Sequence, residues 1–175
     1  MDWVVGLDMS PRGDAALAAV ARIAAAEGAG LEIGVVVVLT QQDLDGTGEI
    51  SGDKKRSVAL ERAFPAAWRR IDDVLSAEGI DSESLSLDVI VRVAAVHLVR
   101  SQEQIAIELL RVMLDHGAPR IALGRRGRPS GVAEYLEARG VLEELPGSAD
   151  GVLSLCVELG ALDLEGSERH RSGPR

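Results

Sequence analysis

The chain has 175 residues and a formal net charge of −9, and 46% of its residues are hydrophobic while 27% are charged. This length and composition predict one globular domain over residues 1–163, followed by a polar, disordered tail over residues 164–175. A negative net charge repels a phosphate backbone, so the sequence argues against nucleic acid as a partner. Aromatic residues make up only 2%, so we expect a core of Ala, Val, Leu and Ile.

The single cysteine, Cys156, allows neither an intrachain disulfide nor a cysteine-based metal site, and its apolar surroundings predict a small buried side chain. The N-terminal residues lack the basic segment of a signal peptide. No apolar stretch has the length that crosses a bilayer, so we expect no membrane partner. These observations predict a cytoplasmic protein.

The first apolar run, residues 3–7, predicts a central strand that ends at Asp8. Ser10 suits a helix N-cap and Pro11 the first helical position, so we expect a helix that continues to about residue 27. Residues 31–39 contain four consecutive valines, which is typical of a strand buried on both faces inside a parallel sheet.

Residues 40–54 are rich in Gly and Asp and predict a long loop. A helix is expected over residues 55–78, kinked or restarted at Pro65. Its apolar stripe of Phe64, Trp68, Ile71 and Leu75 predicts core packing. A third strand follows over residues 85–95.

Residues 101–104 form an S-x-x-Q capping box, which predicts a helix to residue 116. A short strand at residues 121–123, a helix over 131–145 and a strand over 152–159 complete the chain. We expect the last strand at a sheet edge, where it would invite pairing with a second copy. Strands and helices alternate, which predicts an α/β fold: a three-layer, doubly wound sheet of five mainly parallel strands with helices on both faces.

The segment between the fourth strand and the next helix, residues 124–131, holds three glycines and three arginines. A glycine-rich loop between a strand and a helix can cradle phosphate through backbone N–H groups. The alternative is an ordinary turn whose arginines lie in solvent. The density of positive charge in an acidic chain favours an anion contact.

Three features resemble the universal stress protein family over roughly residues 2–158. The first strand ends in Leu7-Asp8-Met9-Ser10, the second strand ends in a Val-rich run, and the fourth strand leads into Gly124-x-x-Gly127. The resemblance implies a homodimer of stress-response or regulatory role that binds ATP or another adenine nucleotide. It places Asp8 at the ribose and Val37 at the adenine, and the backbone of Leu123, Gly124 and Gly127 at adenine and phosphates. The positive charge of Arg126 and Arg128 adds these two side chains to the expected anion site, and Gly140 is the glycine nearest to the place of the family's second motif.

The resemblance weakens after this loop. Nucleotide-binding members carry Gly-Ser or Gly-Thr after nine further residues, whereas Glu137 stands at the corresponding place here and the nearest glycine, Gly140, precedes Val141. The alternative is a homodimeric interaction module of the same fold that binds no nucleotide. His97 is the one histidine expected near the cleft, and we find neither a catalytic constellation nor a metal-ligand pattern.

Overall fold

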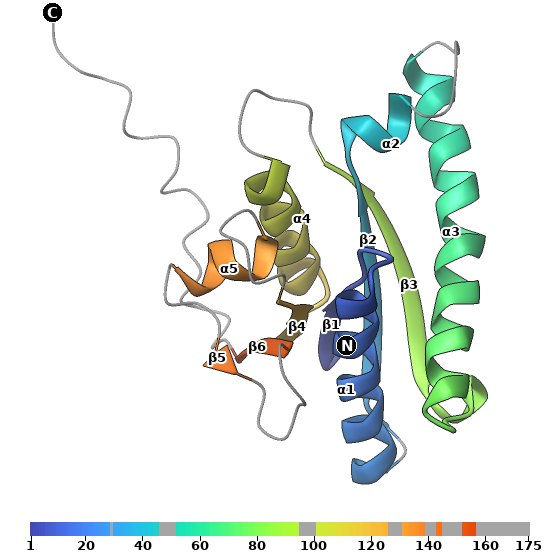
Figure 1. Cartoon of the computed structure of the whole chain (residues 1–175), viewed down its shortest axis with the longest axis vertical. Coiled ribbons are helices and arrows are strands. Elements are labelled where there is room, and N and C mark those ends of the chain that lie inside the picture. The colour runs from blue at the N-terminus through green and yellow to red at the C-terminus, as the bar shows by residue number, and fades with distance from the viewer. Residues whose placement is uncertain are drawn as a thin grey trace, which may run out of the picture.

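The computed structural model describes residues 1–28, 30–45, 52–94, 101–125, 131–138, 143–144 and 152–156. Within these ranges the chain forms an α/β fold around one sheet with the strand order β3-β2-β1-β4-β6-β5 (Figure 1). The strands are β1 (Trp3–Gly6), β2 (Glu32–Leu39), β3 (Ser86–Val93), β4 (Arg120–Gly124), β5 (Glu143–Glu144) and β6 (Val152–Cys156). The helices are α1 (Pro11–Glu27), α2 (Gln41–Asp45), α3 (Gly52–Ala77), α4 (Ser101–Asp115) and α5 (Val132–Glu137), with a 3-10 turn at Ser82–Ser84.

Strands β3, β2, β1 and β4 are parallel, which confirms the predicted α/β class and the central position of the first strand. The run of four valines explains why β2 is deeply buried in the sheet. Val35 and Val37 belong to one hydrophobic core while Val36 belongs to the other, so both faces of the strand are buried.

Two cores lie on opposite faces of the sheet. One packs α1, α2 and α3 against β1, β2 and β3, and the other packs α4 and α5 against β1, β2 and β4. Figure 1 shows α3 and α4 on opposite sides of the strands. As expected from the composition, the cores consist mainly of Ala, Val, Leu and Ile, with Trp3 and Met113 among the exceptions.

The C-terminal part differs from the prediction. Residues 131–145 do not form one helix, because α5 ends at Glu137 and Glu143–Glu144 pair with β6 as β5. Strand β6 is antiparallel to β4 and lies between β4 and β5, so the prediction that it is an edge strand is wrong. The pairing partner β5 carries no strand pattern of its own, which is why the sequence did not reveal it.

The start of α1 confirms a local prediction. Ser10 is the N-cap: its side-chain oxygen accepts a hydrogen bond from the backbone N–H of Gly13 at 3.3 Å, and Pro11 occupies the first turn. The cap satisfies one of the N–H groups that a helix start leaves unpaired. Helix α1 then ends at Glu27, as predicted.

Three other expectations are corrected. Residues 41–45 are helical, because the Asp43 carboxylate accepts hydrogen bonds from both the backbone N–H and the hydroxyl of Thr40 at 2.7 Å, in the manner of a capping box. Helix α3 continues through Pro65, so no second helix begins there. Phe64 is 47% exposed and meets only the edge of Trp68, so it does not join Ile71 and Leu75 in the core.

Candidate functional site

The carboxyl ends of β1, β2 and β4 form the edge at which a ligand site is expected. The chain places β2 and β3 on one side of β1 and β4 on the other, so the strand order reverses between β1 and β4. Open α/β sheets bind ligands at such a reversal. Asp8 follows β1 at this point, and Gly124 ends β4 beside it.

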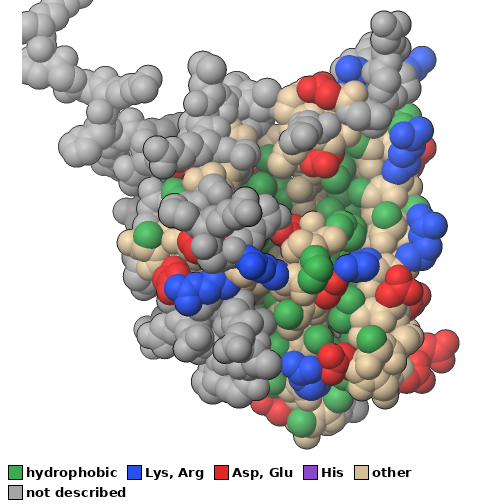
Figure 2. Space-filling model, viewed as in Figure 1, with side chains coloured by type: hydrophobic (Ala, Val, Ile, Leu, Met, Phe, Trp, Pro, Cys, Tyr) green, Lys and Arg blue, Asp and Glu red, His purple; other side chains and the backbone are tan. Residues whose placement is uncertain are grey.

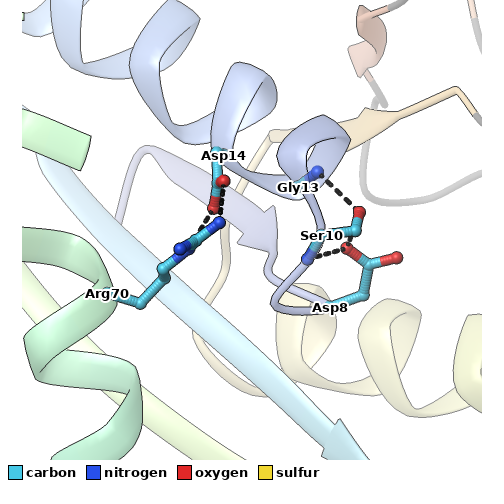
Figure 3. Close-up of polar contacts among 5 residues, drawn as sticks. All are labelled: Asp8, Ser10, Gly13, Asp14 and Arg70. Carbon is cyan, nitrogen blue, oxygen red and sulfur yellow. Dashed lines mark hydrogen bonds and ion pairs between the residues drawn. The ribbon is translucent and has the colours of Figure 1, made fainter. Parts of the chain in front are cut away.

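Asp8 is exposed and is held by the turn that starts α1. Its Oδ1 accepts hydrogen bonds from the backbone N–H of Ser10 at 3.1 Å and from the Ser10 hydroxyl at 2.5 Å. Figure 3 shows the other carboxylate oxygen directed away from Ser10. The turn therefore fixes the orientation of the Asp8 carboxylate before any ligand arrives.

Two neighbours tighten this turn. A Cβ on Gly13 would lie 2.6 Å from Asp8 Oδ1, so only glycine lets α1 approach the carboxylate this closely. Met9, between Asp8 and Ser10, has a φ of 55°, a left-handed conformation that costs energy for a side chain of this kind. Such strain is typical of functional turns, and here it lies beside the predicted ribose contact.

Gly124 has a packing role that the sequence did not reveal. A Cβ at this position would lie 2.2 Å from the backbone oxygen of Arg12, in the first turn of α1. Helix α1 and β4 can therefore approach each other only because residue 124 is glycine. This contact explains the glycine without any ligand, and it also leaves the backbone of Gly124 at the mouth of a cavity.

The first cavity, which we call the α4 hollow, lies between the ends of β1, β2 and β4 and the helices α4 and α5. It has a volume of about 150 Å³. Its walls are mainly apolar and include Val36, Val38, Leu109 and Leu123. Among the described residues that line it, Asp8 and Gln102 carry the polar side chains.

A second cavity, the α3 hollow, opens on the other side of Asp8, toward α2 and α3. It has a volume of about 500 Å³ and is more open. Val37 and Ala63 contribute apolar walls, while Arg62 and Asp43 contribute charge. Figure 2 shows hydrophobic side chains gathered in a recess beside α3 on this face of the molecule. The predicted residues Asp8, Val37, Leu123 and Gly124 thus all line one or both hollows.

Arg125 is the one loop arginine that the structure describes. Its guanidinium donates hydrogen bonds to both carboxylate oxygens of Glu137 on α5, at 2.7 and 2.8 Å. Glu137 therefore neutralises a positive charge that the sequence analysis had predicted to contact an anion. The other predicted contacts, Arg126, Gly127, Arg128 and Gly140, lie outside the described residues, as do His97 and the tail over residues 164–175.

A polar contact that sequence reasoning missed joins α1 to α3 (Figure 3). The Arg70 guanidinium donates to both carboxylate oxygens of Asp14, with Nε 2.8 Å from Oδ1. This hydrogen bonding to Asp14 raises the pKa of Arg70 above its ordinary value, so the guanidinium stays charged. The two residues are 56 positions apart, and no local pattern indicates their contact.

Comparisons of the chain with protein-family models, with curated proteins and with solved structures give no match. Within the described ranges, no helix combines the length and apolar character needed to cross a bilayer. In the same ranges, no three side chains of His, Cys, Asp or Glu are grouped so that they could hold a metal ion.

Proposed function

We propose that this chain is a protein of the universal stress type, with a doubly wound sheet, that binds an adenine nucleotide at the carboxyl edge of the sheet in a sensory or protective role. The observation that carries the proposal is the position of Asp8. Its carboxylate is preset by Ser10, stands at the reversal of strand order, and lines both the α4 hollow and the α3 hollow.

The chemistry of this edge suits a nucleoside. A carboxylate accepts hydrogen bonds from two vicinal ribose hydroxyls, and the apolar walls on either side of it suit a planar base. The family resemblance assigns the base to Val37, whose side chain lines the α3 hollow. The backbone of Gly124 lies on the other side of Asp8, where the resemblance expects the phosphates.

The proposal includes weak binding of ATP. Arg125 is already paired with Glu137, so a phosphate group must compete with a carboxylate for this guanidinium. The glycine-hydroxyl pair of nucleotide-binding family members is also replaced, and one hydrogen bond to a charged group is worth about 1.5–3 kcal/mol. We therefore expect ATP to bind about ten to a hundred times more weakly than it binds to a complete motif.

Calorimetric titration with adenosine and with ATP tests the proposal. Asp8→Asn keeps the oxygen that accepts from Ser10 but replaces the second carboxylate oxygen with an amide nitrogen. We expect this variant to bind adenosine and ATP about tenfold or more weakly than the parent does. Asp81→Asn is the matched control, because Asp81 Oδ1 accepts from the backbone N–H of Glu83 at 3.0 Å in a similar turn far from this edge. Equal affinities in all three proteins would contradict the assignment of Asp8, and nanomolar ATP affinity would contradict the predicted weak site.

A second candidate function is the homodimeric interaction module that binds no nucleotide. Two observations favour it: Glu137 neutralises Arg125, and Phe64 exposes 47% of its surface on α3. Because β5 flanks β6, a dimer through β6 alone is no longer the simplest arrangement. Light scattering at micromolar concentration, on the parent and on Phe64→Ser, tests this candidate. A monomeric parent that binds adenosine would exclude the interaction module. A dimeric parent that does not bind ATP at millimolar concentration would support it.

A further inference from the structure

The α4 hollow has the size and lining of a site for one small planar ring system. An apolar cavity of roughly 150 Å³ in another protein holds one benzene molecule, and the α4 hollow has about the same volume. Its walls come from Gly6, Val36, Leu109, Leu123 and Ala133, among others. Gly6 is part of this shape, because a Cβ there would lie 2.4 Å from Leu123 Cδ2.

The polar groups of this hollow are few and complementary. Asp8 offers hydrogen-bond acceptors, and Gln102, in the first turn of α4, offers both a carbonyl oxygen and an amide N–H₂. Within the described part of the chain, the Gln102 side chain has no hydrogen-bond partner of its own. A mainly apolar hollow with a half-buried, unpaired amide is suited to a heterocycle that both donates and accepts.

We infer that the α4 hollow holds the base of the bound nucleoside and that Gln102 determines the preference for a base with an exocyclic amino group. A glutamine amide pairs with adenine through one donor and one acceptor, which is how it recognises adenine in DNA. The inference rests on the proposed function and names the residue that sets its base specificity. It departs from the family resemblance in the hollow that it gives to each end of the nucleotide. The resemblance places the base beside Val37 and the phosphates beside Gly124, whereas a base in the α4 hollow leaves the α3 hollow, with Arg62, to the phosphates.

The two hollows make the inference testable, because Asp8 lies between them and can contact the ribose from either side. The α3 hollow is wider and more open, with Arg62 and Asp43 on its rim and alanines on the α3 side. It encloses a planar base less tightly than the α4 hollow does. A base in the α3 hollow would not contact Gln102, whereas a base in the α4 hollow would not contact Ala63.

The experiment compares adenosine with purine riboside, which lacks only the exocyclic amino group, by calorimetric titration. We expect the parent to bind adenosine about tenfold more tightly than purine riboside, the ratio that one hydrogen bond of a buried group provides. In Gln102→Leu this ratio should fall to about one. Ala63→Phe, which fills part of the α3 hollow, should leave this ratio unchanged, because the amino group of a base in the α4 hollow does not reach Ala63.

The ratio reports a contact with the amino group, so a general loss of structure cannot imitate the expected result. Circular dichroism establishes that each variant is folded, and Gln102→Ala serves as a second variant if Gln102→Leu is not. Unchanged preference in both Gln102 variants would overturn the inference while the proposed function stands. Loss of adenosine binding in Ala63→Phe would move the base to the α3 hollow and would also overturn it. A parent that binds no adenosine at millimolar concentration would overturn both the inference and the proposed function.

Discussion

Replacing Gly124 with alanine is the sharpest test of the contact between β4 and α1. The added Cβ would lie 2.2 Å from the backbone oxygen of Arg12 and 2.4 Å from its carbonyl carbon. Nonbonded heavy atoms rest about 3.5 Å apart, so the strand and the helix must separate by roughly 1 Å. The obstructing atoms belong to backbone in the first turn of α1, which the Ser10 cap holds in place.

The expected cost follows from which atoms must move. Overpacking a well-packed core costs about 1–3 kcal/mol, and we expect Gly124→Ala at the upper end because backbone cannot rotate away. Gly6→Ala is the matched control on the neighbouring strand. Its added Cβ meets the Cδ2 of Leu123 at 2.4 Å, the far end of a side chain, and a displaced rotamer costs about 0.5–1.5 kcal/mol.

Urea unfolding, followed by circular dichroism, measures both variants against the parent. We expect Gly124→Ala to lower the free energy of unfolding by about 3 kcal/mol, and Gly6→Ala by about 1 kcal/mol. A destabilisation of Gly124→Ala that is equal to or smaller than that of Gly6→Ala would refute the packing explanation. Close packing against α1 would then not be the reason that residue 124 is glycine.

Three further predictions concern the helices on the same side of the sheet. Ser10→Ala removes the side-chain cap of α1 and should lower the free energy of unfolding by about 1 kcal/mol, whereas Ser10→Gly should cost only a few tenths; equal losses would contradict the cap. Pro65→Ala should raise the melting temperature, because a proline inside α3 lacks one helical hydrogen bond and strains the preceding turn, at a combined cost of about 1–3 kcal/mol. An unchanged melting temperature would show that α3 accommodates the proline ring at no cost. In a double-mutant cycle of Asp14→Asn and Arg70→Gln, we expect a favourable coupling that decreases as salt is added; additive effects would show that the ion pair contributes nothing.

Local signals determined much of the fold. The Ser10 and Pro11 pair predicted where α1 begins, because a cap acts on N–H groups within three residues of it. The valine run predicted a strand buried on both faces, since its side chains alternate between two apolar surroundings. Asp8, Val37, Leu123 and Gly124 were predicted to lie together because parallel strands end at a common edge.

The errors arose where a distant partner decides the structure. Residues 143–144 continue a helical pattern by sequence, yet they pair with β6 as a strand, and that partner supplies the hydrogen bonds. Phe64 shares the apolar period of Ile71 and Leu75, but the buried face of α3 runs through Ala59, Ala63 and Ala67, which leaves the Phe64 side chain exposed. Residues 41–45 were a missed local signal, since Thr40 and Asp43 form a capping box that the sequence already contains.

The sequence by itself determined the α/β class, the central first strand and the edge at which Asp8 stands, because periodicity, caps and chain order are local properties. Only the tertiary structure determined which side chains meet at and near that edge. It pairs Arg125 with Glu137, brings Asp14 to Arg70 across 56 residues, and sets Gln102 at the wall of a cavity built from three strands and three helices. Such contacts depend on the relative placement of whole elements, and no spacing along one element encodes them.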